Sequence, residues 1–80
     1  MAQDTKASHE VLLHALNHLK YVKYHAGTVK RTAEAHKQTT TGDTRSKWLA
    51  TALELSVVTR GVEDAITRIE RATAYISSMD

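Results

Sequence analysis

The segment "EVLLHALNH" places a carboxylate and two imidazoles at the spacing that helical metal sites use. Glu10, His14 and His18 follow one another at steps of four residues, so a helix puts them along one side. Two histidines four residues apart can share a divalent metal ion, with the carboxylate as a third ligand. The chain offers no matching fourth ligand, and polar residues on a solvated flank often fall into this spacing. We therefore expect no bound metal, and these three residues are the only candidate ligands.

A second stretch, "LKYVKYHAGTVKR" at residues 19–31, mixes cations with tyrosines and suits a phosphate-bearing ligand. Cationic side chains bind phosphates, while aromatic rings stack on bases. Helical geometry divides these residues into an outward set and a lysine set that recurs every seven residues beside the packed side of the helix. The alternative is that the outward residues only coat a solvated face or join a contact between subunits. The candidate anion-binding or nucleotide-binding residues are Lys20, Tyr21, Lys23, Tyr24, Lys30 and Arg31.

No residues have the arrangement of a catalytic site. The serines lack the glycine-rich turn that presents a hydrolase nucleophile, and no glycine-rich phosphate loop is present. The net charge of +2 is too small to indicate nucleic acid by itself, although residues 1–40 carry six basic and three acidic side chains. We expect no enzymatic activity and no cofactor.

The elements that position these residues follow from the composition. The chain has no proline, three glycines and many strong helix formers, which predicts helix at about residues 4–38 and 44–78. The loop at residues 39–43 contains Gly42, which suits a left-handed position, and Asp43 or Thr44 is expected to cap the second helix. Gly27 weakens a helix interior and could divide the first helix, but the apolar pattern runs through it in phase, so we predict one continuous helix.

Apolar and small residues recur at alternating steps of three and four in both halves, which predicts two antiparallel helices packed along a seam. The expected fold is an all-α hairpin that forms a single domain over residues 1–80. With the loop near residue 42, residue i faces roughly residue 84 − i, which places Lys23 near Glu63 and His36 beside Trp48. The predicted seam comprises Thr5, Ser8, Leu12, Ala15, Leu19, Val22, Ala26, Val29, Ala33 and His36, facing Trp48, Ala52, Leu55, Thr59, Val62, Ile66, Ile69, Thr73 and Ile76.

Further apolar residues lie beside the predicted seam, where a lone hairpin leaves them in water. They form a ridge with a four-residue repeat in the second helix and widen the apolar arc of the first. Two hairpins packed as a four-helix bundle, or a larger oligomer, would bury them; the partner is a second copy or another helical protein. The predicted interface residues are Leu13, Leu16, Leu49, Leu53 and Val57.

Cysteine is absent, so no disulfide framework forms, and no segment reads as a signal peptide or a membrane span. A cytoplasmic location is the expectation, with secretion without an ordinary signal peptide as the alternative.

The second half resembles the early-secreted-antigen family of type VII secretion, the small Trp-x-Gly helical hairpins. The resemblance rests on "KWLATALEL" at residues 47–55 and "ITRIERATAYISSMD" at residues 66–80; the loop lacks the Trp-x-Gly motif. It implies a secreted, dimeric partner or adaptor, with Tyr75 and Asp80 near an export signal.

These patterns favour a non-catalytic protein–protein interaction module, such as a small oligomeric adaptor, chaperone or inhibitor, or a secretion-associated hairpin. The alternative is a small helical nucleotide-binding or nucleic-acid-binding protein that uses the basic and tyrosine residues of the first helix.

Overall fold

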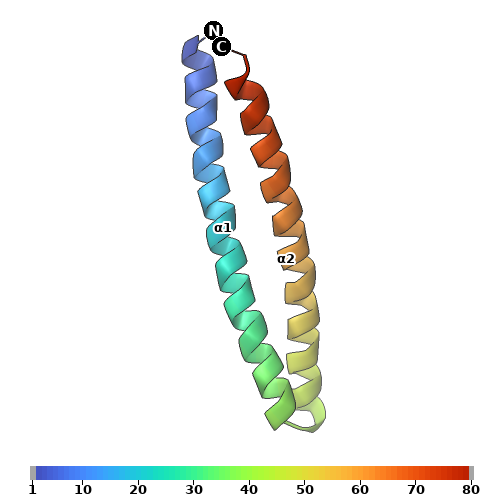
Figure 1. The fold of residues 1–80 in the computed structure, drawn as a ribbon. Coiled ribbons are helices and arrows are strands. Elements are labelled where there is room, and N and C mark those ends of the chain that lie inside the picture. Colours follow the sequence, from blue (N-terminus) through green and yellow to red (C-terminus); the bar gives the residue numbers. More distant parts are fainter. Residues whose placement is uncertain (1, 80) are drawn as a thin grey trace.

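The protein folds as an antiparallel hairpin of two long α-helices. A computed structural model describes residues 2–79, in which α1 covers Ala2–Thr39 and α2 covers Gly42–Ser77. The two helices run side by side from the loop to the end of the molecule where both termini lie (Figure 1). The all-α hairpin expected from the sequence is confirmed, and α1 continues through Gly27 without a break.

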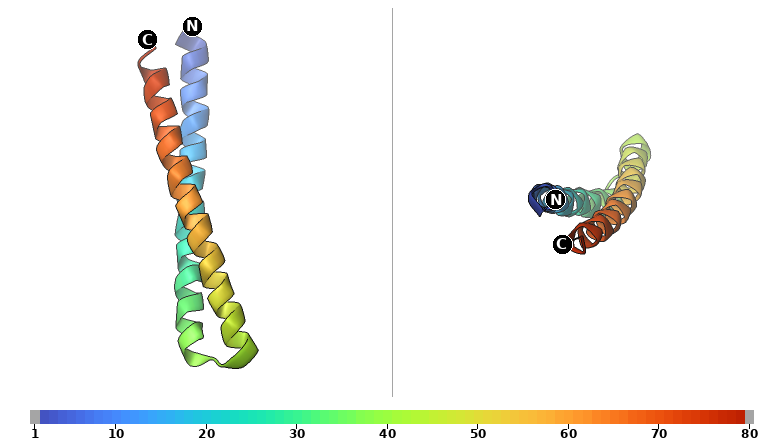
Figure 2. Two further views of the ribbon diagram at one scale, coloured as in Figure 1. Left: turned by 90° about the vertical axis from the view of Figure 1, so that its right-hand side faces the viewer. Right: turned by 90° about the horizontal axis from the view of Figure 1, so that it is seen from above.

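The hairpin is long and thin. Its extents are 60 × 14 × 13 Å, and its radius of gyration is 18.0 Å, against about 11.6 Å for a compact domain of this length. The helices cross gently as they wrap around each other, as the two turned views show (Figure 2). Along residues 2–79, neither helix contains an apolar stretch that could span a bilayer.

The loop between the helices is shorter than expected, with only residues 40 and 41 outside helix. Gly42 has φ = +63°, so the predicted left-handed residue is present at the predicted place. The predicted caps are wrong, because α2 begins at Gly42 and Thr41 occupies the capping position without a side-chain hydrogen bond. Asp43 instead lies in the first turn, where its carboxylate pairs with Lys47 at 3.2 Å.

Side chains in and beside the loop satisfy two of the last carbonyl groups of α1. The hydroxyl groups of Thr39 and Thr40 both donate to the carbonyl of His36, at 3.3 and 2.6 Å. Arg45 reaches back across the loop and donates from Nε to the carbonyl of Lys37 at 3.1 Å. The two threonine bonds close the end of α1, and the Arg45 bond ties that end to the first turn of α2.

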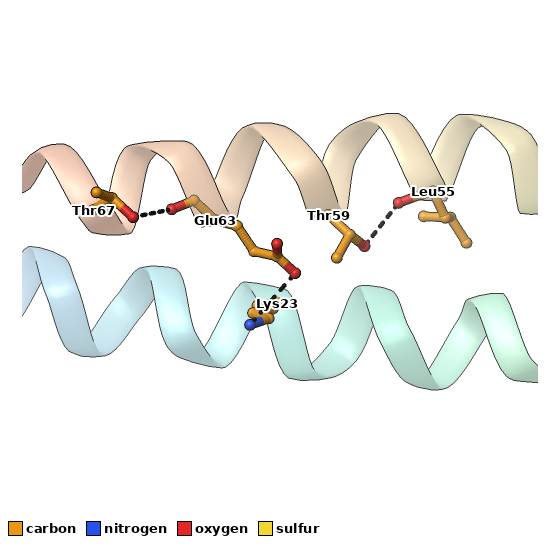
Figure 3. A network of polar contacts seen from close by, with 5 residues as sticks. All are labelled: Lys23, Leu55, Thr59, Glu63 and Thr67. Atoms are coloured by element: carbon orange, nitrogen blue, oxygen red, sulfur yellow. Dashed lines mark hydrogen bonds and ion pairs between the residues drawn. The ribbon is translucent and has the colours of Figure 1, made fainter.

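In α2 the predicted seam is confirmed, since every one of its nine positions is buried or half-buried. Two of them are threonines, Thr59 and Thr73, whose hydroxyl groups donate to the carbonyls four residues earlier, at 2.8 Å each. The bond from Thr59 to Leu55, and a similar bond from Thr67 to Glu63 on the helix surface, are drawn in Figure 3. A threonine can therefore face α1 without requiring a polar partner there.

In α1 the packed stripe is rotated from the prediction. We label the seven-residue repeat a to g, with Leu12 and Ala52 at position a. Position a of α1 is buried or half-buried throughout, as predicted. At position d, however, the predicted seam residues Ser8, Val29 and His36 are exposed, and residues at position e take part in the packing instead. Leu16, at position e, is only 9% exposed, while Lys30 and Lys37 are half-buried because their long apolar stems can lie along the seam.

Two contacts confirm the predicted register of the hairpin. Lys23 Nζ lies 3.5 Å from Glu63 Oε1, midway along the molecule (Figure 3). Near the loop, the rings of His36 and Trp48 are stacked, with centroids 4.7 Å apart and planes 15° apart. The salt bridge is half-exposed and contributes about 0.2–1 kcal/mol, so it marks the alignment more than it stabilises it.

Candidate interaction faces

The hairpin has two long faces on either side of the seam. In a pair of antiparallel helices, the e positions of both helices lie on one side of the seam and the g positions lie on the other. Lys23 and Glu63 are both at position e, and their salt bridge identifies that side. We call the side formed by positions b and e the lysine face, because it includes Lys6, Lys20, Lys23, Lys30 and Lys37.

The lysine face carries most of the predicted interface residues. Leu49 and Leu53 of α2 and Leu13 of α1 are exposed on this face, with Leu53 60% exposed. Val57 is 68% exposed at the neighbouring position f, where it continues the ridge of Leu49 and Leu53 along α2. Leu16 was predicted to belong to this set, and the prediction is wrong. Its side chain packs against α2 within the hairpin, because the rotation of α1 turns position e into the seam.

A basic groove lies on the same face, near the middle of the hairpin. Lys20, Tyr24, Gly27 and Arg31 follow one stripe of α1, and with Lys23 they line a groove of about 540 Å³ whose other wall is Thr59 and Ile66 of α2. Gly27 has no side chain to fill the groove, and a Cβ built there would meet only Arg31 Nη1, at 3.7 Å. Four of the six predicted anion-binding residues are therefore brought together.

The remaining two predicted residues do not line the groove. Lys30 is half-buried beside the seam. Tyr21 lies around the helix from Tyr24, and both rings make edge contacts with His25, at centroid distances of 4.2 and 5.4 Å. The aromatic part of a ligand site would consist of Tyr24 alone.

The candidate metal ligands do not converge. Glu10, His14 and His18 are all exposed on α1. Within residues 2–79, no three histidine, aspartate or glutamate side chains are grouped so that they could hold a metal ion.

The opposite face was missed by the sequence reasoning. It consists of positions d and g of α1 and position g of α2, and we call it the histidine face. Its exposed apolar side chains are Val11, Val29 and Val58, and its ionisable residues along α1 from residue 8 onward are His18, His25 and His36. The available signal was negative: from residue 8 to 39 and from 44 to 79, positions d and g contain no lysine, arginine, aspartate or glutamate.

Comparisons with protein families, characterised proteins and solved structures find no match to this chain. The antiparallel hairpin agrees with the fold that the early-secreted-antigen resemblance implies, but no family match supports the resemblance itself. Of the residues tied to it, Tyr75 is exposed near the end of α2, and Asp80 lies outside the described residues.

Proposed function

We propose that the protein is a non-catalytic protein–protein interaction module, a small oligomeric adaptor in which two hairpins pack as a four-helix bundle. The hairpin supplies two of the four helices, and a second copy of the chain supplies the others. This arrangement is the simplest closed assembly that covers helix faces which a single hairpin leaves in water.

The exposed surface of the hairpin carries this proposal. The chain exposes 6025 Å², whereas a compact protein of 8.9 kDa exposes about 4,800 Å². The excess of about 1,200 Å² exceeds the roughly 800 Å² that each partner contributes to a standard interface. Among the described residues, the buried apolar ones are Leu16, Ala33 and Ala52, which is a small core for a stable monomer.

Sedimentation equilibrium or light scattering tests the assembly directly. The expected mass is twice the 8.9 kDa of the chain or a larger multiple, with a melting temperature that rises with protein concentration. A monomer that melts cooperatively at every concentration would contradict the proposal.

The leucine ridge provides the adaptor's second contact in this proposal. Leu49 and Leu53 lie on the same face as Lys20 and Lys23 of the basic groove, so a suitable partner is a helix with an apolar stripe flanked by acidic residues. Two synthetic helices with the same leucine stripe, one flanked by glutamate and one by lysine, provide the probe. We expect the glutamate-flanked helix to bind the protein and the lysine-flanked helix not to bind. The binding should weaken as the salt concentration rises, and it should be lost in the Leu53→Asp variant. Equal binding of both helices would rule out the charge argument.

The basic groove favours a second candidate function, the binding of a nucleotide or single-stranded nucleic acid. Three cations and Tyr24 line a groove of a size that small ligands occupy. We expect a nucleotide to co-purify with the protein and to be detected by its absorbance at 260 nm. We also expect salt-dependent binding of an oligonucleotide that is lost in Arg31→Glu and kept in the distant Arg71→Glu. Binding that is equally weak in both variants, or absent from the wild type, would eliminate this candidate.

A further inference from the structure

We infer that a second copy of this chain covers the histidine face, and that the lysine face stays open in the dimer. The inference rests on the proposed self-association and assigns it to one of two faces. Its basis is the difference in charge between those faces, together with the exposure of the valines on one of them.

The lysine face opposes contact with its own copy. Positions b and e of the two helices hold six basic residues and three acidic ones, so the face carries an excess of positive charge. A twofold dimer brings the same surface of both chains together, and this face would then meet an equal charge. The basic groove, with Lys20, Lys23 and Arg31, lies in the centre of that contact.

The histidine face meets its copy without such a cost. Along positions d and g from residue 8 to 39 and from 44 to 79, permanently charged residues are absent. Val29 on α1 and Val58 on α2 are 47% and 43% exposed. Toward the termini, the half-buried Ala15, Ala65 and Ala72 on the same face are small enough to let helices approach closely.

The length of the face also suits a dimer contact. The hairpin is 60 Å long, so one face offers a continuous strip along which a second copy can pack.

The test places aspartate substitutions on each of the two faces of the full-length chain. Sedimentation equilibrium then measures the dimer dissociation constant of each variant. We expect Val29→Asp and Val58→Asp to raise the dimer dissociation constant by at least about ten-fold, because each buries an unpaired carboxylate in the contact. Leu53→Asp, on the lysine face, is the matched control and keeps the wild-type dissociation constant. All three positions are at least 43% exposed in the hairpin, and circular dichroism checks that each variant stays helical.

Two results would overturn the inference. If Leu53→Asp dissociates the dimer while Val29→Asp and Val58→Asp do not, self-association uses the lysine face, and the proposed function survives without this assignment. A wild type that is monomeric at every concentration instead removes the proposed self-association itself.

Discussion

Replacing Gly61 by alanine is expected to stabilise the hairpin. Gly61 lies inside α2 with an ordinary helical backbone, since Gly42 is the described glycine with positive φ. A Cβ built at Gly61 meets no atom within 4 Å, so the substitution adds no clash. Alanine also restricts the unfolded chain, and together these effects give about 0.5–1 kcal/mol. For an 80-residue chain that corresponds to a rise of roughly 3–6 °C in Tm.

Thermal unfolding followed by circular dichroism at low protein concentration measures this effect. Gly42→Ala is the matched control, because φ = +63° penalises any Cβ, and we expect it to lower Tm. A fall in Tm for Gly61→Ala at low concentration would refute the reasoning, since it would mean that the space around Gly61 is occupied within the single hairpin. A rise at low concentration that disappears at high concentration would instead locate Gly61 in a contact between copies.

Three further predictions concern the packing between the helices, each measured by urea unfolding. Leu16→Ala should lower the free energy of unfolding by about 2–3 kcal/mol, and Leu13→Ala by less than about 1 kcal/mol, because of the two only Leu16 is buried in the seam. Equal losses would show that α1 is not rotated from the predicted seam. Ala33→Leu should cost about 1–3 kcal/mol, since Ala33 is 0% exposed and has no room for a larger side chain; a neutral result would contradict the close packing there. A double-mutant cycle on Lys23 and Glu63 should give about 0.2–1 kcal/mol, falling in 1 M salt; a salt-independent value would show that the pair is shielded from solvent.

The sequence predicts the packing of α2 well and that of α1 less well, for a reason that lies in the side chains. In α2 the residues at position d are Trp48, Leu55, Val62, Ile69 and Ile76, far more apolar than their neighbours at position e, so the packed stripe is unambiguous. In α1 positions d and e both adjoin position a. The pattern selected Val29 and His36, whereas the structure packs Leu16 and the lysine stems.

Hydropathy treats a lysine as one polar unit, although its stem can cover apolar surface while the ammonium group stays in water. It also treats histidine and threonine as polar, which concealed the histidine face. The groove was partly predictable, because Lys20, Tyr24 and Arg31 share a helical stripe. The contribution of Thr59 and Ile66 was not, since it depends on how α2 is placed across the seam.

The two-residue loop has a consequence for the order in which the chain folds. Closing so short a connection costs little chain entropy, and the stacked rings of His36 and Trp48 are only twelve residues apart in the sequence. Pairing of the helices is therefore expected to begin at the loop and to extend toward the termini. Folding is expected to be fast, because the first contacts are local in the sequence. Amide hydrogen exchange should be slower around the buried Ala33 and Ala52, on the loop side of the hairpin, than around Thr5 and Ile76 near the termini.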